Sequence, residues 1–228
     1  MSNPYITSDL FSFLKDLKAN NSRDWFNENK PRYERVLKEP LLDFIADFAP
    51  LLRSISPHFR AIPKANGGSL FRIYRDVRFS ANKDPYKTHA GIHFRHEAGK
   101  NAHAPGFYLH LEPGSVFIAA GTWHPEPELL RNIRTTIVDF PEEWEAIVQA
   151  PAFATDFKLE GESLKRAPKG FDPENPLIDD LKRKDFIAVC RLDESQSLRP
   201  DFMEMLVSKW RTCSPFARFL AEASGHPF

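Results

Sequence analysis

Residues 69 to 89 carry more side chains suited to binding or proton transfer than any other stretch of the chain. The cations of this stretch are Arg72, Arg75, Arg78, Lys83 and Lys87. Arginine offers a planar fork of donors that matches phosphate or carboxylate, and lysine adds a mobile point charge. Asp76 lies among the arginines but does not balance five positive charges. The stretch therefore predicts a site for a small anionic ligand, either phosphorylated or carboxylated.

The charge distribution leads to the same prediction. The segment from Arg53 to Leu111 holds ten Lys or Arg against three acidic residues, whereas the rest of the chain holds 21 basic and 28 acidic residues. A basic middle on a chain of zero net charge indicates an anionic small ligand or a local nucleic-acid patch. We consider nucleic acid the weaker of these two partners.

A third interpretation makes the motif structural. In this alternative Asp76 pairs with an arginine, acids from the flanking helices pair with the other cations, and Pro85 and Tyr86 pack on the core. The motif would then be an ion-pair latch in a non-catalytic interaction module, whose function lies on a partner surface.

Alternating residues in four predicted strands place further polar groups beside the motif. These strands cover residues 69–75, 90–96, 106–112 and 115–120, and Pro113-Gly114 forms a tight turn between the last two. Side chains alternate between the two faces of a strand. One face is predicted to be apolar, with Phe71, Ile73, Ile92, Phe94, Phe107, Leu109 and Leu111. The other collects Arg72, Tyr74, His93, Arg95, Tyr108, His110 and Glu112. A face rich in Arg, His and Tyr is more typical of a binding surface than of a solvated sheet.

Each of these residue types suggests a role. The five cations of the motif, together with Arg95, are candidates to hold the anion. Tyr74, Tyr86 and Tyr108 are candidates to shape the site or to donate hydrogen bonds. Asp76, His93 and His110 are the candidates for proton transfer, because a positioned carboxylate or imidazole can act as a general acid or base.

The histidines do not form a recognised metal motif. Six of the eight lie between residues 89 and 124, namely His89, His93, His96, His103, His110 and His124. No H-x-x-x-H on a helix and no pair of cysteines accompanies them, and His93 and His96 point to opposite faces of one strand. We therefore predict no metal ion and no cofactor, and whether the histidine cluster binds metal does not follow from the sequence. Cys190 is expected to be buried in a strand, and Cys213 is expected on the last helix. Neither has an evident base nearby, so both are expected to be inert.

Helical segments surround the predicted sheet. Apolar periodicity predicts a helix over 8–19, and Ser22 can cap a second one. Pro31 and Pro40 each fit the first position of a new helical segment. Later helices are expected at 126–138, 141–150, 175–184 and 200–224, with Pro215 a point of interruption in the last. Extended pieces are expected at 153–159 and 163–166, and a buried strand at 186–192.

This order of elements predicts an α+β fold. We expect a single domain over residues 1–228, with a curved antiparallel sheet packed against N-terminal and C-terminal helices. Its parts are a helical layer at 8–55, a sheet core at 69–120 and a mixed part at 121–228. A chain with 42% hydrophobic and 13% aromatic residues can bury a large core. The oligomeric state does not follow from the sequence.

Two further features bear on location. No signal-peptide pattern and no apolar run of about 18 residues is visible, which predicts a soluble protein without a membrane partner. Two cysteines without metal or disulfide spacing suit a reducing compartment. We expect a cytoplasmic protein.

The central motif also resembles a known family. FRIYRDVRFS (residues 71–80) followed by KDPYK (residues 83–87) is similar to the signature of domain of unknown function 2461. Similar segments are NSRDWF at 21–26, GFYLHLEPGS at 106–115 and GTW at 121–123, so the resemblance covers nearly the whole chain and favours a single domain. It implies no activity and no catalytic residue. Ala120 departs from the pattern, which has a second glycine before Gly121, and this bears on how tight the turn there is.

Overall fold

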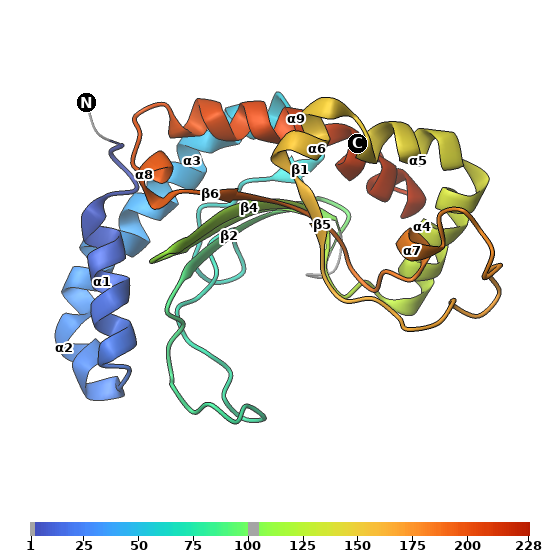
Figure 1. The fold of residues 1–228 in the computed structure, drawn as a ribbon. Helices are drawn as coiled ribbons and strands as arrows, with labels where there is room; N and C mark the ends of the chain where they lie inside the picture. Colours follow the sequence, from blue (N-terminus) through green and yellow to red (C-terminus); the bar gives the residue numbers. More distant parts are fainter. Residues whose placement is uncertain (1–2, 100–104) are drawn as a thin grey trace.

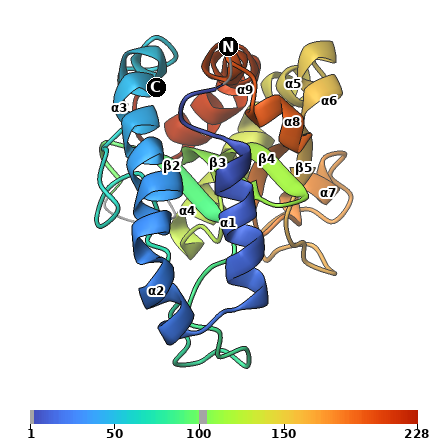
Figure 2. The same cartoon turned by 90° about the vertical axis from the view of Figure 1, so that its left-hand side faces the viewer.

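The N-terminal part is helical because its apolar side chains recur every three or four positions. The computed structural model describes residues 3–99 and 105–228. Its first elements are α1 (Ser8–Ala19), α2 (Arg23–Tyr33), the π-helical turn η1 (Glu34–Lys38) and α3 (Glu39–Arg53). The predicted helix at 8–19 is confirmed. Ser22 caps α2, since its hydroxyl accepts the backbone N–H of Trp25 at 3.3 Å. Figure 2 shows α1 beside the continuous helix formed by α2, η1 and α3.

The two prolines of this layer behave differently. Pro40 is the second residue of α3, one position after the predicted one, and η1 leads into α3 without a break. The prediction for Pro31 is wrong, because this residue lies inside α2 and the helix continues through it. Packing on both sides of Pro31 explains this result: Phe26 contacts Tyr33 at 5.3 Å between ring centroids, and Tyr33 contacts Phe13 of α1 at 5.9 Å. Tertiary contacts thus outweigh the lost backbone hydrogen bond.

The described residues form a six-stranded antiparallel sheet with the order β1-β2-β3-β4-β6-β5. The strands are β1 (Phe59–Arg60), β2 (Ala90–His96), β3 (Gly106–Glu112), β4 (Ser115–Thr122), β5 (Lys158–Glu160) and β6 (Phe186–Leu192). The predictions for β2, β3 and β6 are confirmed residue for residue, and β3 and β4 form the predicted hairpin. Figure 1 shows a curved sheet with α3 and α9 on one side and an uncovered side below.

The prediction of a regular strand at 69–75 is wrong. Residues 69–71 run along the outer edge of β2, where the Phe71 N–H donates to the Gly91 carbonyl at 2.9 Å. The chain then leaves the edge, and the next bridge is between Tyr74 and Tyr86 within the loop itself. β1 pairs with the opposite end of the β2 edge, at Arg95 and His96.

This short contact changes one predicted side-chain orientation. Alternation predicts Phe71 on the apolar face together with Ile73. Instead Phe71 lies on the uncovered face, with its ring centroid 6.0 Å from that of His93 and 5.9 Å from that of Tyr108. Ile73 is buried in the core. The alternation rule fails here because residues 72–73 no longer follow a pleated strand.

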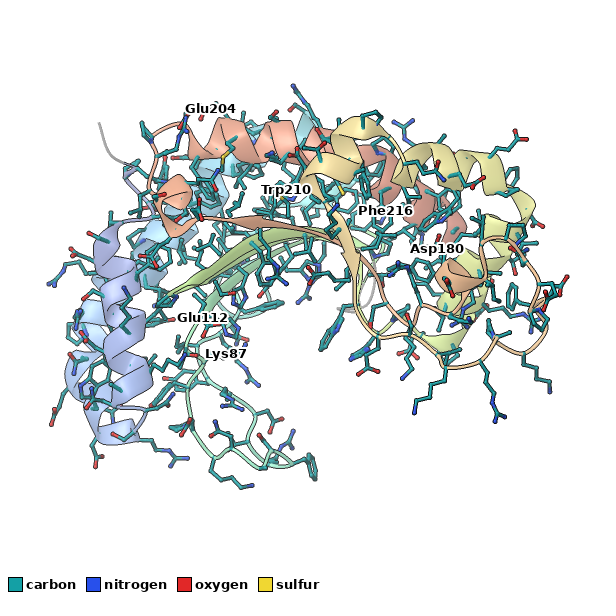
Figure 3. All side chains as sticks on the ribbon, viewed as in Figure 1. Lys87, Glu112, Asp180, Glu204, Trp210 and Phe216 are labelled. Atoms are coloured by element: carbon teal, nitrogen blue, oxygen red, sulfur yellow. The ribbon has the colours of Figure 1, made fainter. Side chains whose placement is uncertain are left out.

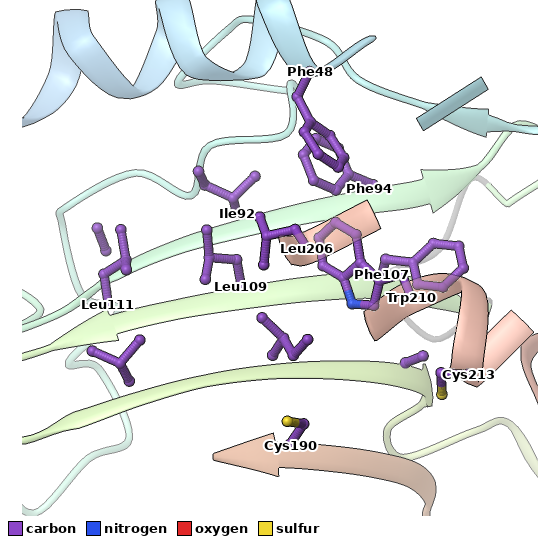
Figure 4. Close-up of a cluster of buried hydrophobic side chains, with 14 of the residues drawn as sticks. Phe48, Ile92, Phe94, Phe107, Leu109, Leu111, Cys190, Leu206, Trp210 and Cys213 are labelled. Atoms are coloured by element: carbon purple, nitrogen blue, oxygen red, sulfur yellow. The ribbon is translucent and has the colours of Figure 1, made fainter. Parts of the chain in front are cut away.

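The covered face of the sheet packs around a single aromatic side chain of the last helix, α9 (Phe202–Ala223). Trp210 is fully buried, and its ring centroid lies 5.5 Å from that of Phe48 on α3. It also contacts Phe94 of β2 at 5.7 Å and Phe107 of β3 at 5.3 Å. Figure 4 shows this cluster, with Cys190 and Cys213 at its edge. One hydrophobic cluster extends from Ile6 to Leu220, so helices from both ends of the chain share one core.

The C-terminal part supplies the remaining helices. They are α4 (Pro127–Asp139), α5 (Pro141–Val148), α6 (Pro151–Asp156), α7 (Ile178–Leu181) and α8 (Glu194–Ser197). The predicted extended piece at 153–159 is wrong for residues 153–156, which belong to α6, and the predicted helix at 175–184 is reduced to α7. Helix α9 continues through Pro215 without a break. Among the described residues, no helix has the length and apolarity needed to cross a bilayer.

Candidate functional site

The uncovered face of the sheet brings together polar side chains from β2, β3 and the motif loop. In the strand register, His93 lies opposite Tyr108, and Gly91 lies opposite His110. All of these positions alternate with core residues such as Ile92 and therefore point away from α3 and α9. Figure 3 shows Lys87 and Glu112 below the sheet beside α1, on the opposite side from Trp210. The face divides into two adjacent groups.

The first group surrounds the aromatic ring of Phe71, and we call it the Phe71 cluster (Phe71, Arg72, Lys87, His93 and Arg95). The Lys87 ammonium lies 5.2 Å from the ring centroid and the Arg95 guanidinium 6.0 Å from it. These distances fall within the range of cation–π contacts. Arg95 also donates from Nε to Nδ1 of His93 at 3.3 Å. The cluster therefore holds cations on an apolar ring.

Burial and like charges act on the ionisable groups of the Phe71 cluster. Burial lowers the pKa of Lys87, and the nearby Arg72 lowers it further. Burial, followed by the charge of Arg95, lowers the pKa of His93 to about 4. The His93 imidazole is therefore neutral near pH 7, and its Nδ1 accepts the hydrogen bond from Arg95.

The second group is the His89 cluster, which consists of His89, His110 and Glu112. One possible ligand atom from each side chain lies within 4.8 Å of the others. The rings of His89 and His110 are 4.5 Å apart between centroids, and His110 Nε2 lies 3.3 Å from Glu112 Oε2. Burial lowers the pKa of His89 to about 4, with a further contribution from His110. Burial also lowers the pKa of His110, although Glu112 opposes this shift.

Tyr108 connects the two groups. Its hydroxyl lies 3.0 Å from Nδ1 of His110, and its ring centroid lies 6.4 Å from that of His93. Burial raises the pKa of Tyr108, with a smaller contribution from Glu112. Its hydroxyl therefore stays protonated and can either donate to or accept from His110.

The tip of the motif loop is organised by its own side chains. Asp76 and Arg78 form an ion pair, with the Nη2 atom of Arg78 2.7 Å from Oδ2 of Asp76. The hydrogen bond from Arg78 lowers the pKa of Asp76 to about 2. Lys83 donates to the carbonyl of Val77 at 3.0 Å. These three predicted site residues therefore lie apart from the uncovered sheet face, at the exposed end of the loop.

The aromatic part of the motif packs on the N-terminal helices. Tyr86 is buried and stacks on Phe26 of α2 at 4.1 Å between ring centroids. Tyr74 is half exposed and contacts the same two rings. The side chain of Asn21 accepts the Tyr86 backbone N–H and donates to the Tyr86 carbonyl. Tyr74 and Tyr86 thus anchor the loop to α2.

Three cations of the motif and one of β2 have no acidic partner among the described residues. Within residues 3–99 and 105–228, no carboxylate oxygen lies within 4.0 Å of a charged nitrogen of Arg72, Arg75, Lys87 or Arg95. The Nη2 atom of Arg75 donates to the Ser80 hydroxyl at 3.5 Å. The Arg75 backbone N–H donates to the Pro85 carbonyl at 2.9 Å, which fixes the start of the loop.

Sequence reasoning misses two members of this face. It places Phe71 in the core, and it singles out His89 only as the end of the motif. Part of the His89 cluster can be predicted from the sequence, because His110 and Glu112 are two residues apart on a strand and so share a face. His89 directly precedes Ala90, which pairs with Leu111. His103 lies outside the described residues.

Two cavities are found away from this face. One of about 240 Å³ lies between α4 and the loop around Phe171, with Arg131 and Lys169 in its lining. Another of about 380 Å³ lies between α3 and α9. Neither is lined by a residue of the motif or of the two clusters, so both are separate from the candidate site.

A protein family matches most of the chain. A sequence model described as conserved hypothetical protein (DUF2461) matches residues 9–219. The chain belongs to this family. No curated protein matches it. Because the family description names no activity, the function has to be argued from the uncovered face itself.

Proposed function

We propose that the uncovered sheet face binds a small anionic ligand, phosphorylated or carboxylated, beside the Phe71 cluster. The observation that carries the proposal is the group of Arg72, Arg75, Lys87 and Arg95, which lack acidic partners within the described residues. Cations held close together without acids repel one another, and a bound anion relieves this repulsion. The fork of Arg95 suits a planar carboxylate or phosphate edge.

The basic segment as a whole supports the same proposal. Two of its arginines do form ion pairs, Arg60 with Glu97 and Arg78 with Asp76, and both acids belong to the segment itself. Within the part of the chain that the structure describes, no acid from the flanking helices pairs with its Lys or Arg residues. The positive charge of the segment is therefore left for a ligand.

Neutral imidazoles beside the cations give the face a means to move protons. His93 and His110 are neutral near pH 7 because burial lowers the pKa of each. Each ring must release one of its present hydrogen bonds to take a proton from a bound ligand, because Arg95 occupies Nδ1 of His93 and Tyr108 and Glu112 occupy the two nitrogens of His110. Asp76 suits this role less well, because Arg78 lowers its pKa and keeps its carboxylate ionised at the exposed loop tip.

Thermal unfolding in the presence of candidate anions tests the proposal. The site variant is Lys87→Met, which keeps an apolar stem over Phe71 but removes the charge. The matched control is Arg78→Met, which removes a charge from the same loop where Asp76 already pairs with it. The panel consists of inorganic phosphate, nucleoside monophosphates, sugar phosphates, di- and tricarboxylates, and a short oligonucleotide.

We expect one anion class to raise the melting temperature of the wild type and of Arg78→Met. Ligand at 100 times its Kd adds about 2.7 kcal/mol, which corresponds to roughly 5–11 °C in a domain of this size. Lys87→Met should need at least about tenfold more ligand, since a hydrogen bond to a charged group contributes about 1.5–3 kcal/mol. Equal loss of the response in both variants would contradict the proposal.

The second candidate function is the interaction module with a structural latch. The observation in its favour is the loop tip, where Asp76 pairs with Arg78 and the neighbouring Phe79 is 96% exposed. Tyr86 anchors this loop on Phe26, as the latch requires. This function is favoured if no anion shifts the wild type, while Arg78→Met, which breaks the ion pair, and Tyr86→Ala each lower the melting temperature. Nucleic acid is tested by the oligonucleotide, whose binding should weaken steeply with salt.

We also propose a cytoplasmic location. Cys190 and Cys213 are both unpaired and buried, and burial raises the pKa of each thiol. Protonated, buried thiols persist in a reducing compartment and form no disulfide framework.

A further inference from the structure

The His89 cluster has the composition and spacing of a metal-ion site. It offers two imidazole nitrogens and one carboxylate, all within 4.8 Å of one another. Donors bound to one tetrahedral ion at about 2.0–2.2 Å lie about 3.3–3.6 Å from each other. His110 Nε2 and Glu112 Oε2 already have this spacing, at 3.3 Å. His89 completes the set from the start of β2, with its ring centroid 4.5 Å from that of His110.

We propose that His89, His110 and Glu112 bind one divalent transition-metal ion, with at least one coordination position open toward the uncovered face. Two imidazoles and one carboxylate suit zinc, iron(II), cobalt(II) or nickel(II), whereas magnesium and calcium prefer oxygen donors alone. Three protein ligands with an open position are typical of metal sites that bind or activate a small molecule.

Two neighbouring side chains hold the ligands in place. Thr88 donates from its hydroxyl to Glu112 Oε1 at 3.3 Å, which leaves Oε2 facing His110. The Tyr108 hydroxyl lies 3.0 Å from His110 Nδ1, so that Nε2 is the nitrogen directed to Glu112. Contacts of this kind fix the tautomer and ring orientation of metal-binding histidines and typically contribute about 10–100-fold to affinity.

The Tyr108 hydroxyl can form a hydrogen bond with His110 both in the metal-free and in the metal-bound site. Without metal it donates to Nδ1 of His110, while Nε2 keeps its proton and donates to Glu112. With metal it accepts from Nδ1–H, which leaves the Nε2 lone pair for the ion. A hydroxyl is both donor and acceptor, so no buried polar group loses its partner in either state. The imidazole stays neutral throughout, because its single proton moves from Nε2 to Nδ1 when the ion binds.

The charged side chains around the site determine which kind of ligand would fill the open coordination position of the ion. Lys18 approaches Glu112 Oε1 at 3.8 Å from α1, and Lys87 and Arg75 act on the neighbouring His89. These cations weaken the attraction for a free divalent ion. They also favour an anionic fourth ligand, such as a phosphate or carboxylate oxygen, because it would contact the metal and the cations together. The metal site extends the proposed anion-binding function but does not depend on it.

Titration of the metal-free full chain with cobalt(II) and zinc(II) tests this proposal. Cobalt(II) reports its coordination through visible absorption bands, and zinc(II) competition gives the affinity of the spectroscopically silent ion. The site variants are His110→Asn and Glu112→Gln. Glu112→Gln leaves an oxygen to accept from Thr88, so its fold should persist, and circular dichroism checks this. The control is His58→Gln, which removes a histidine paired with Glu97 at 2.7 Å elsewhere on the protein.

We expect the wild type and His58→Gln to bind one equivalent of cobalt(II), with absorption bands typical of four- or five-coordinate nitrogen and oxygen ligands. His110→Asn and Glu112→Gln should each weaken binding on the order of 100-fold, and Tyr108→Phe about 10–100-fold. The proposal is overturned if the wild type binds no cobalt(II) or zinc(II), or if both site variants bind as well as the wild type.

A second titration separates this proposal from anion binding. Inorganic phosphate is added to the metal-free and the zinc-loaded protein, in the wild type and in Lys87→Met. A phosphate response of the metal-free wild type that Lys87→Met loses supports the anion site on its own. Tighter phosphate binding after zinc loading supports the open coordination position. If metal fails to bind, the phosphate result for the metal-free protein still stands.

Discussion

At the scale of single residues, pairing partners distinguish side chains that look equivalent in the sequence. Arg75 and Arg78 are three positions apart and of the same type, yet Arg78 pairs with Asp76 and Arg75 has no carboxylate within 4.0 Å in the described chain. The spacing predicts a cluster of cations but not which of them remain available, because that depends on where the loop leaves the sheet edge. The cations best placed for a ligand are therefore Arg72, Arg75, Lys87 and Arg95.

The neutral state of His93 leads to a prediction about pH. Its pKa is about 4 in the folded protein and about 6.5 in the unfolded chain. The unfolded chain therefore binds more protons between these values, and stability falls as pH drops from about 6.5 to 4. Between pH 7.5 and pH 5 the wild type should lose about 2 kcal/mol more free energy of unfolding than His93→Gln, as measured by urea denaturation. Carboxylates titrate in both proteins, so their contribution cancels in this difference. Parallel losses in the two proteins would show that His93 is charged or hydrated in the fold.

At the scale of elements, alternation and turn residues predict much of the sheet. Ala90–His96, Gly106–Glu112 and Phe186–Leu192 have the predicted bounds, and the Pro113-Gly114 turn joins β3 to β4. These predictions succeed because each strand is long enough for one face to be buried along its whole length. The segment at 69–75 fails because only residues 69–71 follow β2. Its alternation therefore says nothing about the orientation of Phe71.

The same failure affects the candidate site. His93, Tyr108 and His110 could be placed on one face from β2 and β3 alone. Phe71 and His89 could not, because both lie where the chain enters or leaves regular pairing. The predicted face is thus correct for strand residues and incomplete for loop residues, which set the distance between the cations and the histidines.

The end of β4 gives a prediction about backbone conformation. Gly121 has a φ of 125°, and a Cβ there would lie 2.0 Å from the carbonyl oxygen of Phe186 on β6. Because that neighbour is backbone, Gly121→Ala should lower the free energy of unfolding by about 3 kcal/mol or more, measured by urea denaturation. Gly114→Ala is the control: its φ is also positive, at 77°, but no atom lies within 4 Å of the position that its added methyl group would take. It should cost only about 1–2 kcal/mol.

Equal costs in these two variants would mean that the close approach of β6 to Gly121 does not exist. The neighbouring Ala120 fits this account. It pairs with Phe107 and Ala188 in the sheet and is buried. The expectation of a turn here is wrong, because β4 continues through Gly121 to Thr122. Of Ala120 and Gly121, only Gly121 has a backbone conformation that requires glycine.

At the scale of the whole molecule, one core joins segments that are far apart in the chain. Helices α3 and α9 cover the same face of the sheet, and the cluster around Trp210 includes Phe48, Phe94 and Phe107 (Figures 1 and 4). This arrangement leaves the opposite face without α3 or α9 over it, so its Lys87, Arg95 and Tyr108 side chains are partly exposed, whereas His93 and His110 are each 9% exposed. The α+β class follows from the order of elements, but which face remains open depends on how α3 and α9 dock.

A shared core predicts that the chain unfolds as a single cooperative unit. Trp210 is fully buried and contacts α3, β2 and β3, so Trp210→Ala removes packing from the N-terminal, central and C-terminal parts together. The substitution should cost about 3–5 kcal/mol of unfolding free energy. Urea unfolding of the wild type and of Trp210→Ala should give one transition each, with the same midpoint by far-UV circular dichroism and by the fluorescence of the remaining tryptophans. Two transitions, with only one shifted by Trp210→Ala, would divide the chain into separate domains and would detach the N-terminal helices from the sheet that they cover.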